Sequence, residues 1–380
     1  MIRNRIPGLL CMSVLCGILI LGLWPFHRPR NQVSWLGVEN GLRFGGYGTI
    51  ISAGTFQMAG SQEQASCSLE IWLQPELVSD SNTFLSFSSS ENPLQFSLHQ
   101  YLSNVILKRE IPGGQRRTEV IGIEGVFRQI KPRFLTITSS AQGTEMYVDG
   151  ALARAFPGFR LGKDFTGQLV IGTSPVRSDG WPGQLKGLAI YDRELTANQV
   201  AKHYETWTMQ AAPELVGDEH LMALYLFNEH TGSVIHNALH PGIDLYIPKR
   251  FSLLHQMFLR PFWKEFKPEW SYVRYTLMNI VGFIPLGFFF YAYWTSARPI
   301  KSATLATVFW GLAISLTIEI LQSYLPTRSS GTTDLLTNTF GTFLGVRLHG
   351  SRISQTLLAR VHKSGITSRS MPAGAVRPKC

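Results

Sequence analysis

Cysteine is scarce in this chain, and its placement excludes the kinds of site that depend on it. Only four of the 380 residues are cysteine: Cys11 and Cys16 in an apolar run, Cys67 alone in the middle, and Cys380. No Cys-x-x-Cys pair and no Cys/His spacing occurs, so the sequence predicts neither a disulfide framework nor a zinc site. Two or three domains of ordinary size fit in this length, and a hydrophobic core alone can stabilise them.

Acidic residues are missing where two other chemistries would need them. A calcium site needs several converging oxygen ligands, but Asp149, Asp179 and Asp192 are dispersed. A glycosidase needs paired carboxylates, and no strand carries an ExDxxE-like run. We therefore assign no catalytic residue, metal ligand or cofactor, and a rim-bound Ca²⁺ remains only an alternative.

The net charge of +10 would suggest a nucleic-acid binder if the charge were spread over the chain. It is not, because residues 1–30 hold four basic residues, residues 347–380 hold seven, and neither stretch holds an acid. Basic residues confined to such ends are typical of membrane topology rather than of a phosphate-binding groove. The expected partner is a lipid bilayer and not a nucleic acid.

Long apolar runs account for four predicted helices. Residues 1–30 read as an uncleaved N-terminal anchor, with a signal peptide as the alternative, because the run ends in "LWPFHRPR" and not in small residues. Residues 275–294 and 303–325 are long enough to span a bilayer. Residues 335–348 are short for a span, so a re-entrant segment is the alternative there.

The positive-inside rule predicts the orientation of these helices. Arg298 and Lys301 lie between the second and third runs, and a basic tail, residues 350–380, follows the fourth. Both termini are therefore expected in the cytoplasm, with the loop around Arg328 outside. Residues 251–274, rich in aromatic and basic side chains, read as a segment lying at the outer interface. The tail itself reads as an amphipathic helix followed by a disordered end.

Residues 31–250 have a different character, with short alternating runs separated by turn signals. "CSLEIWLQP" and "RFLTITSS" alternate apolar and polar positions, and Asp149-Gly150 reads as a two-residue hairpin turn. One helix is expected after Thr196, a candidate N-cap. Many strands without intervening helices predict a two-sheet all-β sandwich. The fold class is thus a multidomain protein: a sandwich plus a bundle of about four transmembrane helices.

The ordered series "GLRFGGYGTI", "CSLEIWLQP", "LTITSSAQGTEMYVDG", "LVIGTS" and "WPGQLKGLAIYDRELTANQVAKHYETW" resembles laminin-G-like, concanavalin A-like jelly rolls. The resemblance implies a two-sheet sandwich that binds a glycan or a protein, sometimes through Ca²⁺ at a rim, and the predicted topology places it outside the cytoplasm. Trp72, beside Glu70 on a strand, and Trp181, in the loop "SDGWPGQ", are the candidate sugar platforms. The alternative for Trp72 is a core residue and for Trp181 a packed loop anchor.

"NIVGFIPLGFFFYAYW" and "IEILQSYLPTRSSGTTDLLTNTFGTFLG" resemble the VanZ-like family of small membrane proteins, with the sandwich inserted after the first helix. The family's named member is associated with resistance to the glycopeptide antibiotic teicoplanin, which implies a role in the bacterial envelope. The recurring family elements match these residues: Asn279, Glu319, Gln322, Arg328, Asp334, Asn338 and Gly341.

Helical spacing places Glu319 and Gln322 on one face, and Asp334, Asn338, Gly341 and Gly345 on another. The two glycines permit close helix approach, and we read them and Pro285 as packing features. We expect the polar residues to converge near the outer leaflet, with Arg328 as the counter-ion of Glu319 and Asp334.

Two readings of this cluster stay open: a ligand site, or a tie between helices. Two classes of function follow. In the first, the sandwich binds an envelope glycan, polymer or protein and the helices anchor it. In the second, the chain is a membrane enzyme or small-solute handler that acts on an envelope lipid or peptide through Glu319, Arg328 and Asp334.

Overall fold

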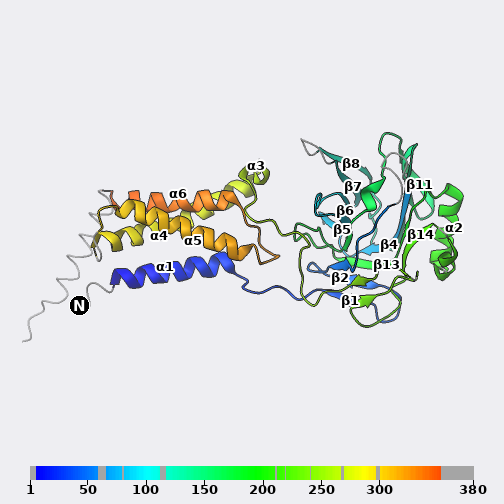
Figure 1. Cartoon of the computed structure of the whole chain (residues 1–380), viewed down its shortest axis with the longest axis horizontal. Helices are drawn as coiled ribbons and strands as arrows, with labels where there is room; N and C mark the ends of the chain where they lie inside the picture. The colour runs from blue at the N-terminus through cyan, green and yellow to red at the C-terminus, as the bar shows by residue number, and fades with distance from the viewer. Residues whose placement is uncertain are drawn as a thin grey trace, which may run out of the picture. The chain divides into compact units, whose positions relative to one another are not determined.

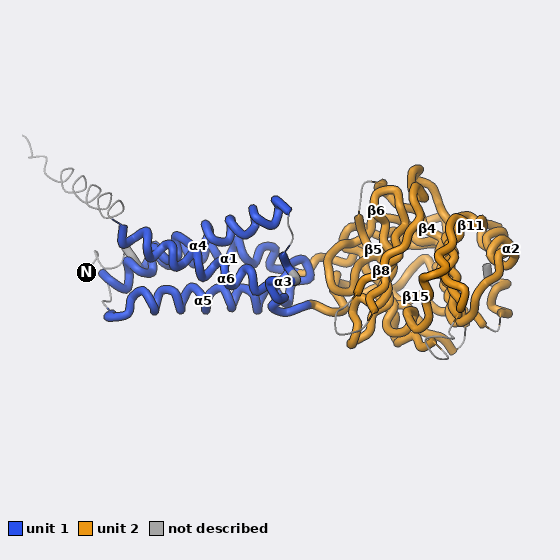
Figure 2. The backbone as a smooth tube through the Cα atoms, turned by 90° about the horizontal axis from the view of Figure 1, so that it is seen from above, with its two compact units in different colours: residues 1–27, 257–380 blue, residues 28–256 orange. Residues whose placement is uncertain are grey.

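The computed structural model describes residues 6–58, 66–78, 81–111, 117–209, 212–218, 220–239, 241–266, 269–296 and 300–351. The chain divides into two compact units, residues 1–27 with 257–380 and residues 28–256, coloured separately in Figure 2. We call them the helical unit and the sandwich unit and describe each by itself.

The sandwich unit contains two antiparallel sheets, as the alternating runs predict. The first has the strand order β1-β2-β13-β4-β9-β10-β11, and β14 pairs with β13. Its strands are β1 (Val33–Trp35), β2 (Leu42–Phe44), β4 (Cys67–Pro75), β9 (Arg133–Ser140), β10 (Gly143–Val148), β11 (Ala151–Phe156), β13 (Gly183–Tyr191) and β14 (Leu221–Tyr225).

The second sheet has the order β15-β16-β3-β12-β5-β6-β7-β8. Its strands are β3 (Ile50–Ser52), β5 (Ser81–Ser88), β6 (Phe96–Tyr101), β7 (Asn104–Ile111), β8 (Arg117–Ile123), β12 (Gln168–Ile171), β15 (Val234–Ile235) and β16 (Leu245–Tyr246). The main core forms from alternate residues of both sheets, for example Leu69 and Ile71 of β4 with Phe87 of β5 and Phe96 of β6. A strand's period of two puts every second side chain on the core face, so the sequence alternation is the direct cause of this packing.

Two local predictions in this unit are confirmed. Asp149 and Gly150 both have positive φ, 51° and 79°, and join β10 to β11 in a tight hairpin. Helix α2 (Ala197–Thr208) starts after Thr196, whose side chain forms a capping box with Gln199. The helix covers one sheet through a second apolar cluster that includes Trp207. The 3-10 helices η2 (Lys163–Phe165) and η3 (Ala212–Gly217) lie in connections.

The helical unit consists of α1 (Ile6–Leu23), the short α3 (Phe262–Glu265), α4 (Trp270–Ser296), α5 (Ala303–Gln322) and α6 (Thr332–His349). The four long helices lie side by side (Figure 1). Among the described residues α4 and α5 are long and apolar enough to cross a membrane, while α1 is apolar but shorter.

The boundaries of this unit differ from expectation at two places. Helix α4 begins at Trp270, so residues 270–274 of the expected interfacial segment belong to the helix. Helix α6 runs unbroken for 18 residues, longer than the predicted 14-residue run. The amphipathic helix expected in the tail lies outside the described residues.

Glycines bring α4 and α6 into backbone contact. A Cβ added at Gly341 would lie 2.2 Å from the carbonyl oxygen of Ile280, and one at Gly345 would lie 2.1 Å from that of Ile284. Gly287 of α4 meets the Thr342 carbonyl in the same way, at 2.0 Å. Small residues at such crossings let helices approach to backbone distance.

Candidate functional site

A polar pocket of about 550 Å³ lies at one end of the helical unit. We call it the interhelical pocket. Its wall combines the end of α1, the residues around α3, the start of α4, the end of α5 and the start of α6. The lining residues are Leu21, Gly22, Arg260, Glu265, Glu269, Ser271, Tyr272, Tyr275, Thr276, Asn279, Gln322, Thr327, Arg328, Ser329, Thr333 and Asp334.

Asp334 and Asn279 meet across two helices in this pocket. The side-chain nitrogen of Asn279 in α4 donates to Oδ1 of Asp334 in α6 at 2.7 Å. Asp334 lies in the first turn of α6, where the exposed backbone amides of a helix favour negative charge. The structure thus brings together two predicted residues that are 55 positions apart in the sequence.

A second carboxylate, Glu265, also reaches the start of α6. Its Oε2 accepts a hydrogen bond from the Thr333 amide at 3.1 Å. Gly331 makes room for it, since a Cβ there would lie 1.8 Å from Oε1 of Glu265. A side chain at position 331 would displace this carboxylate from its place, so glycine leaves room for the observed contact.

Glu319 does not line the pocket. Its side chain is 1% exposed, and its Oε2 accepts from the Gly331 amide at 2.8 Å. Gln322, one turn later, does line the pocket and donates to the carbonyl of Gly22 at 2.7 Å, which joins α5 to α1. Asn338 lies deeper, where it donates to Ser315 Oγ at 3.0 Å and joins α6 to α5.

The prediction that Arg328 is the counter-ion of Glu319 and Asp334 is wrong. Its Nε donates to the carbonyl oxygen of Trp24 at 3.0 Å, and its Nη2 donates to the same oxygen. Trp24 follows the last residue of α1, where helix carbonyls have no partner within the helix and attract cations. Within the described part of the chain, no carboxylate lies within 4.0 Å of this guanidinium.

Sequence reasoning missed Arg260, Glu265 and Glu269 as pocket residues. They belong to the segment read as interfacial, where charges among aromatics are ordinary. The missed signal was the pair of acids within "RPFWKEFKPEW". Two backbone hydrogen bonds join this segment to the start of α6. The Arg260 amide donates to the Ser330 carbonyl at 3.0 Å, and the Thr332 amide donates to the Arg260 carbonyl at 2.9 Å.

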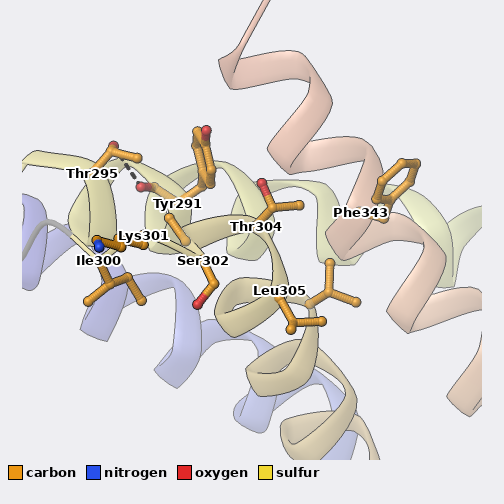
Figure 3. Close-up of a pocket in the computed structure, with 10 residues that line it drawn as sticks. Tyr291, Thr295, Ile300, Lys301, Ser302, Thr304, Leu305 and Phe343 are labelled. Atoms are coloured by element: carbon orange, nitrogen blue, oxygen red, sulfur yellow. Dashed lines mark hydrogen bonds between the residues drawn. The ribbon is translucent and has the colours of Figure 1, made fainter.

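A second pocket, of about 540 Å³, lies where α4 ends and α5 begins (Figure 3). Lys301 is the charged residue in its lining, which also includes Tyr291, Thr295, Ser302 and Phe343. The Thr295 hydroxyl donates to the Tyr291 carbonyl at 2.8 Å, the dashed line in Figure 3. The proton of that hydroxyl is therefore used within its own helix and is not available to a ligand. None of the predicted site residues lies in this pocket.

The two candidate sugar platforms in the sandwich unit differ in exposure, since Trp181 is buried and Trp72 is partly exposed. Trp181 is 1% exposed, packs against Phe44 and Phe84, and donates from Nε1 to Gln100 at 2.7 Å. Trp181 is therefore a packed loop anchor, and the prediction that it is a sugar platform is wrong because the ring is buried. Trp72 is half-buried beside the α2 cluster, and Lys186 Nζ lies 5.6 Å from its ring centroid.

A polar pocket of about 500 Å³ at η2 and the ends of β6 and β7 is the better ligand candidate in the sandwich unit. Gln95, Arg109 and Asp164 line it. Arg109 lies 3.7 Å from Asp164 and forms a 2.6 Å ion pair with Glu119. Burial raises the pKa of Asp164, although the nearby guanidinium opposes that shift. Among the described residues, no group of three or more His, Cys, Asp or Glu side chains could hold a metal ion.

Comparison with solved structures returns distant likenesses. The binding domain of Paraclostridial Mosquitocidal Protein 1 is 13% identical with a TM-score of 0.37, covering 47% of this chain and 47% of that one. The Botulinum Neurotoxin Type G Receptor Binding Domain is 16% identical with a TM-score of 0.31, covering 46% of this chain and 50% of that one. This chain spans about half the length of the solved chains that it matches. No curated protein sequence matches it.

Family models match two stretches of the chain. Residues 45–201 match the model described as the concanavalin A-like lectin/glucanases superfamily, of laminin G type. Residues 220–350 match the model described as VanZ/LLP1, which starts within the sandwich unit, just before β14, and continues through α6. The chain therefore carries a VanZ/LLP1-like region at residues 220–350 and a laminin-G-like, concanavalin A-like domain at residues 45–201.

Proposed function

We propose that this chain is a multi-pass protein of the bacterial cytoplasmic membrane, with α1, α4, α5 and α6 as its four spans. The termini lie in the cytoplasm and the sandwich unit lies outside. Support comes from the two helices that are long and apolar enough to cross and from the membrane-associated VanZ/LLP1 family. The basic residues near 298–301 and after 347 also favour this orientation.

In this proposal the interhelical pocket binds a polar ligand of the cell envelope. One observation carries it: charged groups of both signs line one pocket without pairing with each other. Arg260 and Arg328 line it with Glu265, Glu269 and Asp334, yet no ion pair within 4.0 Å joins the two sets in the described structure. Ionisable groups at a membrane bundle that do not neutralise one another favour a ligand site.

The alternative that the polar residues only join helices to one another explains some of them but not all. Asn338 with Ser315, and Gln322 with Gly22, join helices directly and need no ligand. The enzyme alternative needs Glu319, Arg328 and Asp334 to act together, and the structure separates them. Glu319 does not line the pocket and accepts a hydrogen bond from the Gly331 amide. Arg328 donates to the carbonyl oxygen of Trp24. A binding role therefore fits the geometry better than catalysis.

The sandwich unit is a second candidate binding element, for an envelope glycan, polymer or protein. The observation in its favour is the polar pocket around Gln95, Arg109 and Asp164. Its hydrogen-bonding side chains suit hydroxyl-rich ligands, which need a few placed polar groups for orientation. A glycan array probed with the full chain would test this role, and absence of binding to any envelope carbohydrate would contradict it.

Access to the interhelical pocket tests the main proposal. In a chain whose Cys16 and Cys380 are replaced by serine, Thr276→Cys places a thiol in the pocket wall, while Thr307→Cys places one at a 1% exposed site in α5. We expect a small charged thiol reagent to modify position 276 and to leave position 307 unreacted in lipid nanodiscs. Equal protection of both thiols would mean that the pocket is closed to water-borne groups and would refute the proposal.

A further inference from the structure

We propose that the interhelical pocket binds a zwitterion that carries a primary ammonium group and a phosphate, as a phosphoethanolamine headgroup does. This inference rests on the proposed ligand-binding role of the pocket and names the class of ligand. It follows from which hydrogen-bonding positions of the lining residues remain unused.

The anion-binding side of the pocket is formed by two guanidiniums. Among the described residues, the side chain of Arg260 hydrogen-bonds only to the thioether sulfur of Met257, at 3.7 Å. Arg328 directs two of its donors to one carbonyl oxygen, that of Trp24. A guanidinium has five N–H donors, so both side chains keep donors for a ligand. The planar fork of arginine matches the oxygens of a phosphate better than a single point charge would.

The cation-binding side is formed by three carboxylates. Within the part of the chain that the structure describes, each has one hydrogen-bond partner: Thr333 for Glu265, Asn279 for Asp334 and Ser271 for Glu269. A carboxylate can accept about four hydrogen bonds, so acceptors remain. Glu265 and Asp334 carry like charge in the wall of one pocket, and a cation bound between them would relieve their repulsion.

An ammonium group suits these carboxylates better than a metal ion does. Calcium and magnesium need oxygen ligands that converge within about 2.0–2.6 Å of one point. In the part of the chain that the structure describes, no group of three or more acidic, His or Cys side chains converges in that way. The three N–H donors of a primary ammonium can instead reach separate carboxylates, whereas a quaternary ammonium offers none.

Both charges must belong to one ligand for the pocket to be satisfied. A ligand with only negative charge would meet three carboxylates, and one with only positive charge would meet two guanidiniums. The volume of about 550 Å³ accommodates a headgroup of this size. The neighbouring apolar surface of α4, where Leu277, Met278 and Val281 are exposed, would lie in lipid, so a membrane lipid is the nearest source of such a zwitterion.

Lipid retention by the full chain tests this inference. The protein is placed in nanodiscs of phosphatidylcholine, phosphatidylethanolamine and phosphatidylglycerol in equal amounts with matched acyl chains, and retained lipids are counted by native mass spectrometry. We expect phosphatidylethanolamine to be retained about tenfold over each of the others, the effect of one charge-assisted hydrogen bond. Asp334→Asn and Arg260→Gln should each abolish this preference.

Glu194→Gln, in the sandwich unit, and Lys301→Gln, at the other helical pocket, are charge-matched controls that should keep the preference. Stabilisation of the chain in phosphatidylcholine nanodiscs by soluble O-phosphoethanolamine would support the same chemistry from a water-borne source. Absence of both effects, or a preference that survives Asp334→Asn and Arg260→Gln, would overturn the inference. If Thr276→Cys still reacts in that case, only the ligand class fails and the ligand-binding role stands.

Discussion

Glu70 is a carboxylate with no exposed surface, in the middle of β4. It accepts hydrogen bonds from the Tyr191 hydroxyl at 3.0 Å, from His203 at 2.9 Å and from the Trp207 indole at 3.2 Å. Burial and the neighbouring carboxylate raise the pKa of Tyr191, which keeps this donor protonated. A buried charge is tolerated only when it is fully hydrogen-bonded, and here its donors also fix α2 to the sheet.

His99 in β6 is the residue whose titration should most affect stability. Its ring nitrogens contact the hydroxyls of Thr83 at 3.1 Å and Ser97 at 2.8 Å. Burial, together with the positive charges of Lys108 and Arg177, lowers the pKa of His99 from 6.5 to about 3. The unfolded chain therefore binds more protons than the folded chain between pH 6.5 and about 3. The stability contributed by neutral His99 is complete above pH 6.5 and is lost as the pH falls.

We expect the free energy of unfolding of the sandwich unit to fall by about 2 kcal/mol between pH 7.5 and pH 5 because His99 stays neutral in the folded state. Thermal unfolding of the full chain across this range should show the loss, and His99→Gln, which does not titrate, should reduce the slope. Burial also raises the pKa of Asp179, and this raised pKa acts on stability in the opposite direction, equally in both chains. Parallel pH profiles of the two proteins would contradict the prediction.

The α4–α6 contact depends on glycine at fixed positions of both helices. Gly341→Ala or Gly345→Ala would place a methyl group about 2 Å from a backbone carbonyl oxygen, which cannot move as a flexible side chain can. We expect each substitution to destabilise the helical unit by about 1–3 kcal/mol through overpacking. Thermal unfolding of the purified protein in detergent measures this loss.

Gly282→Ala is the matched control, because no atom of the described structure lies within 4 Å of a Cβ added there. Alanine should be neutral or slightly stabilising at that position, since its helix propensity exceeds that of glycine. Equal effects of the substitutions at positions 282 and 341 would show that helix propensity, and not the close contact, governs this site.

Helix and strand positions were largely predictable from local patterns. The Thr196 cap, the Asp149-Gly150 hairpin and the apolar runs of α4 and α5 all appear in the structure. The start of α4 was predicted five residues too late, at 275, because aromatic and charged residues mask a helix end when periodicity is the only signal.

The orientation of the whole protein in the membrane can be tested by labelling. Single cysteines at Glu194, in the sandwich unit, and Ser329, between α5 and α6, should react with an impermeant maleimide added to sealed right-side-out vesicles. A cysteine at Ser302, between α4 and α5, should react only after the vesicles are opened. Reaction at Ser302 with protection at Glu194 would place the sandwich unit in the cytoplasm and refute the proposed topology.

The insertion of a complete sandwich after α1 has a consequence for how the helical unit is assembled. Helix α1 is separated from α4 by more than 200 residues, yet packs beside it and is joined to α5 by Gln322. Residues 28–256 form their own compact unit, with their own cores. The contacts of α1 with α4 and α5 therefore close a loop of more than 200 residues of the chain.

The sequence by itself determined the classes of structure, because period-two alternation, apolar run length and turn residues act through neighbours in the chain. It therefore specified a two-sheet sandwich and an apolar helical region, and its motifs carried the family resemblance. Only the tertiary structure decided which polar groups meet. In the structure Arg328 donates to the Trp24 carbonyl, and Trp181 is buried in the core. Arg260 and Glu265 line the same pocket as Asp334. Such partners depend on packing between segments far apart in the chain, and local pattern does not encode those distances.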